Sequence, residues 1–143
     1  MIVYVDASAL VKRYVVEEGS EDVSRLIDES DLVGTGLITR AEVSAALKKA
    51  VRMKALTLEE AEAAVKAFRS QWNDFVRVQA SESLISKADT VAWEYDLRGY
   101  DAVHLASALV WQEAIGESVT IATYDHQLRE ASKRAGLNVY PSN

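Results

Sequence analysis

Apolar residues along the chain follow two patterns, short and largely apolar runs and longer stretches with helical spacing. The runs are too short for helices, and such runs are typical of strands buried on both faces of a parallel sheet. They cover residues 2–5, 32–35, 75–78, 118–123 and 137–140. The helical spacing predicts helices over residues 9–18, 21–30, 39–51, 57–74, 81–96, 100–115 and 125–135. Alternating strands and helices predict an α/β fold, with a parallel sheet of about five short strands, right-handed crossovers and flanking helices.

Residues 39–74 are expected to form an antiparallel helical hairpin that protrudes from the sheet, because only a short link around 54–56 joins its two helices. Each helix opens on a threonine followed three residues later by a glutamate, the pattern of a capping box. The two pairs are Thr39 with Glu42 and Thr57 with Glu60. Single serines, Ser20 and Ser81, are predicted to cap two other helices.

The composition narrows the classes of function. A net charge of −6 and a pI of about 4.9 argue against a protein that holds nucleic acid by bulk positive charge. Metal ions can still offset negative charge locally. The absence of cysteine excludes disulfides, zinc–thiolate sites and thiol nucleophiles, and two histidines leave little for a serine–histidine triad.

Length and hydrophobicity bound the organisation of the chain. With 143 residues, 49% of them hydrophobic, the sequence predicts one domain over residues 1–143 with a substantial core. No apolar run reaches the length of a membrane span. We therefore expect a cytoplasmic protein that has no cleaved signal and does not enter a membrane.

Four carboxylates are expected at one edge of the predicted sheet. Asp6 follows the first and central strand, Asp125 follows the fourth strand, and Glu42 and Asp101 lie in the first turns of helices. A helix that follows a parallel strand begins at the carboxyl end of that strand, where ligands bind in open α/β sheets. Each acid also has a structural interpretation. Asp6 and Asp125 are candidate N-caps, Glu42 completes a capping box, and Asp101 lies at the positive end of a helix dipole.

Asp101 is the acid that these structural interpretations leave unexplained. It begins an otherwise apolar helix, where a carboxylate is costly unless it is paired or metal-bound, and we expect desolvation to be worst there. Carboxylates close together repel one another, and a hard divalent cation relieves that repulsion. Mg²⁺ binds through one or two carboxylates together with waters and a substrate phosphate. Such a set suits hydrolysis of a phosphodiester by an activated water.

Short motifs surround the four acids. They are Val5-Asp6-Ala7-Ser8, Thr39-Arg40-Ala41-Glu42, Arg98-Gly99-Tyr100-Asp101-Ala102-Val103-His104-Leu105-Ala106 and Thr123-Tyr124-Asp125. In their order and spacing across the whole chain they resemble the PIN domain, and within that family the VapC-type toxins of prokaryotic toxin–antitoxin pairs. The resemblance implies a three-layer α/β/α fold and a Mg²⁺- or Mn²⁺-dependent ribonuclease.

The resemblance also implies roles for individual residues and partners for the chain. The metal-binding and catalytic acids would be Asp6, Glu42, Asp101 and Asp125. Ser8 and Thr123 match small hydroxyl positions that support the acids by hydrogen bonds. The partners would be an RNA substrate and a cognate antitoxin protein that places a basic side chain near the acids. Apolar Leu56 and Leu58 near the hairpin tip lead us to expect a homodimer and a groove for an antitoxin helix or strand.

Other polar and aromatic residues have a structural interpretation that we favour. Arg98 could contact an RNA phosphate, but a surface ion pair is the simpler expectation. His104 is expected to be a hydrogen-bonded core histidine rather than a general base, and His126 an exposed residue in the first turn of its helix. The tryptophans are expected in the core or an interface: Trp72, Trp93 and Trp111. A basic cluster is expected to be a solvated helix face, with RNA-backbone contact as the alternative: Lys48, Lys49, Arg52 and Lys54.

Other functions remain open. A non-catalytic PIN-like interaction module would keep the fold and the hairpin without needing a metal. A phosphoryl-receiver domain would need paired acids after the first strand and a lysine after the last strand. Here Asp6 stands alone and residues 138–143 contain no lysine. A phosphatase of the haloacid-dehalogenase type would have Asp-x-Asp where this chain has Asp6-Ala7-Ser8. A metal-dependent thermal shift and an RNA cleavage assay discriminate among these alternatives.

Overall fold

The computed structural model describes residues 1–142, and its centre is a five-stranded sheet with the strand order β3-β2-β1-β4-β5. The strands are β1 (Ile2–Val5), β2 (Leu32–Gly36), β3 (Val76–Val78), β4 (Val119–Ala122) and β5 (Asn138–Tyr140). Every pairing is parallel, and Tyr4 of β1 lies opposite Gly34 of β2 and Ile121 of β4. The predicted strands, their parallel arrangement and the central first strand are confirmed, and the last strand lies at an edge of the sheet.

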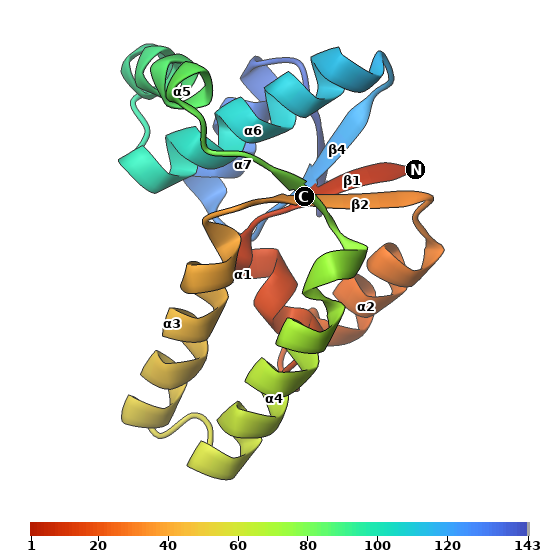
Figure 1. Cartoon of the computed structure of the whole chain (residues 1–143), viewed down its shortest axis with the longest axis vertical. Coiled ribbons are helices and arrows are strands. Elements are labelled where there is room, and N and C mark those ends of the chain that lie inside the picture. The colour runs from red at the N-terminus through yellow and green to blue at the C-terminus, as the bar shows by residue number, and fades with distance from the viewer. Residues whose placement is uncertain (143) are drawn as a thin grey trace.

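Helices cover both faces of the sheet, which gives the predicted three layers (Figure 1). On one face lie α1 (Ala7–Leu10), a 3₁₀ turn (Val11–Arg13), α2 (Ser20–Glu29), α3 (Thr39–Arg52), α4 (Leu58–Gln71) and a second 3₁₀ turn (Trp72–Asp74). On the other lie α5 (Glu82–Tyr95), α6 (Gly99–Ile115) and α7 (His126–Arg134). Because side chains alternate along a strand, Val3 and Val5 pack with the first group and Tyr4 with the second. No helix within residues 1–142 combines the length and the apolar character needed to cross a membrane.

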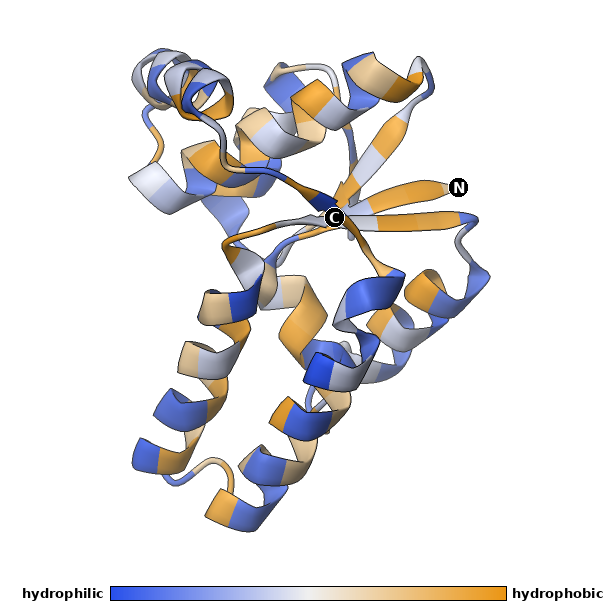
Figure 2. Ribbon diagram, in the orientation of Figure 1, coloured by the Kyte–Doolittle hydropathy of each residue, from blue (hydrophilic) through white to orange (hydrophobic). Residues whose placement is uncertain are grey.

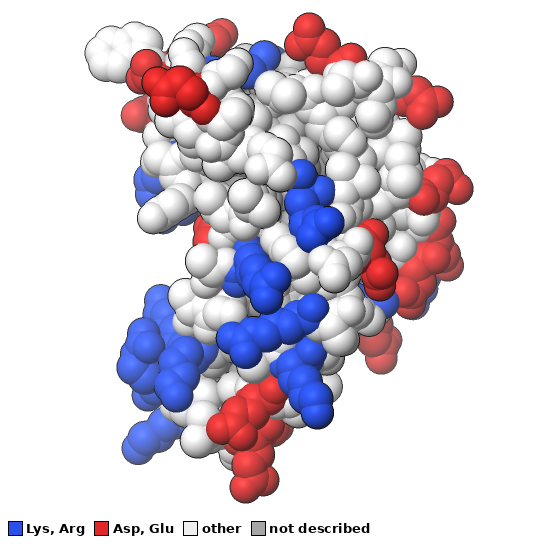
Figure 3. Space-filling view, viewed as in Figure 1, with Lys and Arg blue, Asp and Glu red and all other residues white. Residues whose placement is uncertain are grey.

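The helices α3 and α4 form the predicted hairpin and extend away from the sheet (Figure 1). The capping box of α4 is confirmed, because the Glu60 N–H donates to Thr57 Oγ1 at 3.1 Å and the Thr57 N–H donates to Glu60 Oε1 at 2.9 Å. Apolar and polar positions alternate along both helices (Figure 2), and among the apolar ones Val43, Leu47 and Phe68 are buried. Basic side chains gather over α3 (Figure 3), and the predicted cluster is exposed: Lys48, Lys49, Arg52 and Lys54.

The predicted capping box at the start of α3 is wrong. Ile38 is the N-cap residue and makes no side-chain cap bond. Thr39 is fully buried, and its hydroxyl lies 2.8 Å from the Thr35 hydroxyl. A buried hydroxyl needs a partner inside the fold, and Thr35 supplies it. Glu42 is therefore free of a capping role, which removes the structural interpretation that the sequence offered for it.

The predicted cap at Ser20 is also wrong. Ser20 is the first residue of α2 rather than its cap, because Gly19 precedes it with φ +89° and the Ser20 hydroxyl donates to the Val15 carbonyl at 2.7 Å. Of the three tryptophans, Trp72 and Trp111 are buried as predicted. Trp93 is 93% exposed and lies outside the core, so its place in an interface stays a prediction.

Candidate active site

Asp6 lies at the carboxyl end of the central strand and is the most buried of the four predicted acids, with 3% exposure. Its Oδ1 caps α1 by accepting from the Ala9 N–H at 2.9 Å, and it also accepts from the Ser8 hydroxyl at 2.7 Å. Oδ2 accepts from the hydroxyl of Thr123, which directly follows β4, at 2.6 Å. The N-cap interpretation is confirmed, and the same side chain joins the ends of two neighbouring strands.

Ser8 and Thr123 connect Asp6 to the loop that follows β4. The Tyr124 N–H donates to Ser8 Oγ at 2.9 Å, and the Asp125 N–H donates to Thr123 Oγ1 at 3.0 Å. The hydroxyls of Ser8 and Thr123 therefore each accept a hydrogen bond from a backbone N–H and donate one to an oxygen of Asp6. Both oxygens of this carboxylate are held in a fixed orientation.

Arg98 bridges two of the other acids. Its Nε donates to Asp101 Oδ2 at 3.1 Å, and its Nη2 donates to Asp125 Oδ2 at 2.7 Å. The Arg98 side chain is 71% exposed, whereas those of Asp101 and Asp125 are 14% and 24% exposed. The expected ion pair of Arg98 is confirmed, and its partners are two of the predicted site residues. Asp125 also caps α7 by accepting from the Leu128 N–H at 2.9 Å.

Glu42 is held by His104. Glu42 Oε1 lies 2.7 Å from His104 Nε2, and the hydroxyl of Tyr4 lies 2.8 Å from His104 Nδ1. His104 is 2% exposed, so the predicted hydrogen-bonded core histidine is confirmed. His126 is exposed at the start of α7, also as predicted.

The carboxyl groups and His104 perturb one another. Burial raises the pKa of Asp6, although the charge of His104 and the hydrogen bonds from Thr123, Ser8 and Ala9 oppose it. Burial and the charge of Asp125 raise the pKa of Asp101, against the opposing effect of Arg98. Burial disfavours the charged form of His104, but the hydrogen bond to Glu42 and the surrounding carboxylates outweigh it, and the pKa of His104 is raised.

The expectation that desolvation is worst at Asp101 is wrong, because Asp6 is the more deeply buried carboxylate. The first turn of α6 projects from the core, and both Gly99 and Tyr100 are exposed there. The apolar character of α6 applies to its later turns.

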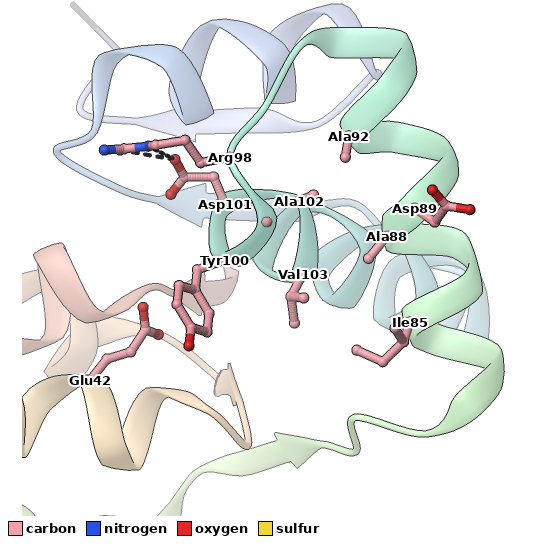
Figure 4. Close-up of a pocket in the computed structure, with 11 residues that line it drawn as sticks. Glu42, Ile85, Ala88, Asp89, Ala92, Arg98, Tyr100, Asp101, Ala102 and Val103 are labelled. Carbon is pink, nitrogen blue, oxygen red and sulfur yellow. Dashed lines mark hydrogen bonds and ion pairs between the residues drawn. The ribbon is translucent and has the colours of Figure 1, made fainter.

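A cavity of about 660 Å³ adjoins the acids, with Glu42, Arg98 and Asp101 at one side and α5 at the other (Figure 4). Most of its remaining lining is apolar, from Ile85, Ala88, Ala92, Ala102 and Val103. Tyr100 extends from the first turn of α6 on the side where Glu42 lies (Figure 4). The volume is in the range of ligand sites in proteins, so the acids can be reached by a molecule from solution.

Three of the four acids are connected to one another through a single bridging residue each time. Thr123 connects Asp6 to the backbone of Asp125, and Arg98 connects Asp125 to Asp101. Glu42 is hydrogen-bonded to His104 and lines the same cavity as Asp101. Within residues 1–142, no three carboxylate or imidazole groups are gathered closely enough to bind a metal ion in this arrangement.

Sequence reasoning missed Tyr4 and the second partner of Arg98. The available signal for Tyr4 was its hydroxyl on a strand expected to be buried on both faces, since a buried tyrosine hydroxyl requires a hydrogen-bonding partner. For Arg98 the spacing to Asp101 was visible in the sequence. The pairing with Asp125 depends on β4 lying next to β1 and could not be read from it.

This fold and its acidic edge define the class of protein. A comparison with protein-family models matches residues 3–134 to the PIN domain, and the chain belongs to the PIN domain family. Ribonuclease VapC45 of Mycobacterium tuberculosis is 36% identical over 142 residues, which are 99% of this chain and 96% of that protein. Ribonuclease VapC46 of the same species is 33% identical over 138 residues, which are 96% of this chain and 95% of that protein.

Solved structures agree with this family in fold. The crystal structure of PAE2754 from Pyrobaculum aerophilum has a TM-score of 0.67 at 22% identity and covers 97% of this chain and 89% of that chain. A toxin–antitoxin complex from Klebsiella pneumoniae has a TM-score of 0.66 at 18% identity and covers 99% and 98% of the two chains. At these identities the likeness establishes the fold alone.

Proposed function

We propose that this chain is a metal-dependent endoribonuclease that hydrolyses RNA phosphodiester bonds and acts as the toxin of a toxin–antitoxin pair. The observation that carries the proposal is the set of acids at the carboxyl edge of the sheet, in a chain 36% identical to a protein named ribonuclease VapC45. Asp6, Asp101 and Asp125 are connected there through Thr123 and Arg98, and Glu42 lines the same side of the cavity as Asp101. These four side chains are the proposed catalytic and metal-binding acids.

Mg²⁺ or Mn²⁺ is the proposed cofactor, and the donor chemistry of the site fits such an ion. Carboxylate oxygens are the protein ligands that hard divalent cations prefer. A cationic group, the guanidinium of Arg98, lies between Asp101 and Asp125 in this structure. The raised pKa of Asp6 and of Asp101 means that their ionised forms are costly here, and a cation offsets that cost. When bound, the ion lowers the pKa of a nearby water and neutralises charge that develops on the phosphate.

The other residues of the site position these acids and the substrate. Ser8 and Thr123 orient Asp6 by donating to its two oxygens. Arg98 is mostly exposed. Within residues 1–142, its ion-pair partners are Asp101 and Asp125. Asp101 and Asp125 would help to hold the cation, and the exposed guanidinium beside them would pair with an RNA phosphate.

The hairpin and its surroundings support a protein partner and a homodimer. Met53 and Leu58 near the tip are 70% and 47% exposed, and Val16 opposite α4 is fully exposed. A cavity of about 740 Å³ runs between α4, α2 and the segment after α1. Exposed apolar surface of this kind fits an amphipathic helix or strand of an antitoxin.

RNA cleavage with defined products tests the enzymatic proposal. The chain should cut RNA in Mg²⁺ or Mn²⁺ to 5′-phosphate and 3′-hydroxyl ends, and EDTA should stop it. Asp125→Asn keeps an N-cap residue for α7 and should lower the rate at least about 100-fold, because it removes charge from the metal site. The matched control is Glu130→Gln, which alters an exposed carboxylate on the same helix and should retain full activity.

Each alternative function has its own outcome in these experiments. Cleavage that persists in EDTA, or that yields 2′,3′-cyclic phosphate, contradicts the metal mechanism. A folded protein that cuts no RNA and still binds the product of a neighbouring antitoxin reading frame is a non-catalytic interaction module. Sedimentation at high concentration tests the homodimer, and Leu58→Glu should shift the protein towards monomer without loss of fold.

A further inference from the structure

A buried chain of hydrogen bonds runs from the central strand to Glu42. Tyr4 is fully buried, and its hydroxyl lies 2.8 Å from His104 Nδ1. The two rings meet edge to face, with centroids 5.9 Å apart. His104 Nε2 lies 2.7 Å from Glu42 Oε1, whose side chain is 28% exposed. Glu42 thus reaches the cavity while its carboxylate is held from inside the core.

The chemistry of the three groups fixes the direction of the bond to Glu42, and in the neutral imidazole it also fixes the direction of the bond to Tyr4. An ionised carboxylate can only accept, so His104 must carry a proton on Nε2 to bond Glu42. In the neutral imidazole the other nitrogen, Nδ1, then has no proton and accepts from the Tyr4 hydroxyl. Burial raises the pKa of Tyr4, so the hydroxyl keeps its proton and remains a donor. Protonation of the imidazole would reverse only the bond to Tyr4, and the Nε2–H would still face Glu42.

The backbone leaves space for this arrangement at Gly36. A β-carbon at that position would stand 2.7 Å from the Tyr4 hydroxyl and 3.8 Å from His104 Nδ1. The first distance is too short for a real contact, and the atom in the way is a polar one that is fixed by His104. A glycine at the end of β2 is therefore what allows the Tyr4 hydroxyl to reach the imidazole.

We propose that Tyr4 and His104 are positioning residues for Glu42, in which the Tyr4 hydroxyl holds the imidazole as the tautomer that donates through Nε2 to the carboxylate. This inference rests on the proposed function, since it assigns Glu42 to the metal site. Carboxylates that bind metals are themselves held by hydrogen bonds, and loss of such a partner typically lowers metal affinity or activity about 10- to 100-fold. Without the imidazole, the partly exposed Glu42 on α3 would sample several rotamers and lose its fixed place at the cavity that Asp101 also lines.

The tautomer can be measured without RNA or metal. Long-range ¹H–¹⁵N correlation spectra of the histidine rings distinguish a protonated from an unprotonated nitrogen. The chain has two histidines, so in the His126→Gln variant every histidine signal comes from His104. At high pH, where the His104 imidazole is neutral, Nε2 should carry the proton and Nδ1 should be unprotonated. A proton on Nδ1 in that state would overturn the proposal.

Metal binding separates positioning from simple stabilisation. Tyr4→Phe and His104→Leu should each weaken Mn²⁺ binding about 10- to 100-fold by calorimetry. They should lower kcat for RNA more than they raise KM. His104→Gln retains a donor near the Nε2 position and should keep most of the Mn²⁺ affinity and most of kcat. The matched control is Tyr14→Phe, which removes a tyrosine hydroxyl that donates to Gln71 at 2.7 Å away from the acids.

The outcomes distinguish this inference from the proposed function. If Tyr4→Phe costs as much stability as Tyr14→Phe but leaves Mn²⁺ affinity and kcat unchanged, the hydroxyl is only structural and the positioning role is refuted. If the parent cuts no RNA while the Nε2 tautomer and the loss of Mn²⁺ affinity are both observed, the ribonuclease proposal fails and the positioning of Glu42 stands.

Discussion

The acidic edge of the sheet and the helical hairpin are built by different kinds of contact. At the edge, the Asp6 carboxylate accepts a hydrogen bond from the hydroxyl of Thr123, a residue 117 positions away in the sequence. In the hairpin, the start of α4 is set by two bonds between Thr57 and Glu60, three positions apart. The edge therefore depends on the whole fold being formed, whereas the hairpin end is specified by its own sequence.

This difference separates the consequences of substitution. A change at the edge alters a network of buried polar groups and the proposed chemistry together. A change at the hairpin alters local helix stability and the surface offered to partners. The two regions meet at Glu42, which lies on α3 but bonds to His104 of α6. Variants in each region, ranked by expected effect, test how far they are independent.

The largest expected effect is at Asp6. Asp6→Ala removes the acceptor of the Ala9 N–H and of two hydroxyl groups, and it removes the N-cap of α1. We expect a loss of about 2 kcal/mol in the free energy of unfolding, since relief of a buried charge offsets part of the lost bonding. RNA cleavage should fall at least about 100-fold.

A cap at another helix provides the control for Asp6→Ala. Ser81→Ala removes the N-cap bond to the Leu84 N–H of α5, and neither residue lines the cavity beside the acids. It should cost about 1 kcal/mol by denaturant unfolding and leave the cleavage rate intact. Equal loss of activity in both variants would show that Asp6 acts only through stability.

The sequence predicted most of the fold because the signals for its elements are local. Short apolar runs, helical spacing and the caps at Thr57 and Ser81 depend on near neighbours, and the parallel arrangement of the strands followed from the alternation of strands and helices. The acids at the carboxyl edge followed from the same topology. The chain's membership in the PIN family, inferred from the spacing of motifs, is confirmed.

What the sequence did not reveal depends on contacts between distant elements. Thr39 has the spacing of a cap, but its burial against Thr35 takes it out of that role. The bridge from Arg98 to Asp125 and the bond from Tyr4 to His104 join residues that are 27 and 100 positions apart. Burial of Asp6 beyond that of Asp101 likewise reflects three-dimensional packing. Helix composition alone pointed to the wrong carboxylate.

A smaller effect on stability, dependent on pH, is expected at Asp101. Its folded pKa is raised from 3.8, first by burial and then by the charge of Asp125. A raised folded pKa contributes stability that is fully present below the unfolded pKa and is lost as pH rises through the folded one. The metal-free parent should therefore lose stability relative to Asp101→Asn as pH rises above about 4. At neutral pH the variant should be as stable as the parent or more stable by up to about 1 kcal/mol. The gain is small because solvent reaches Asp101 and because the variant loses the ion pair with the exposed Arg98.

Melting curves with EDTA and with Mg²⁺ measure both parts of this expectation. Mg²⁺ should raise the melting temperature of the parent by mass action and raise that of Asp101→Asn much less. RNA cleavage should be abolished in the variant. If Asp101 only favours the helix dipole, the substitution should instead cost a few tenths of a kcal/mol, with activity and the response to Mg²⁺ unchanged.

The smallest consequence for the proposed chemistry is expected in the hairpin. Thr57→Ala breaks the capping box of α4 and should lower the free energy of unfolding by about 1 kcal/mol. Because Thr57 lies at the far end of the hairpin from Glu42, the cleavage rate and Mn²⁺ affinity should not change. Hydrogen exchange should show faster opening at the start of α4 and unchanged protection in β1. If Thr57→Ala also weakens Mn²⁺ binding, the hairpin and the acidic edge are coupled through α3, and the division between them does not hold.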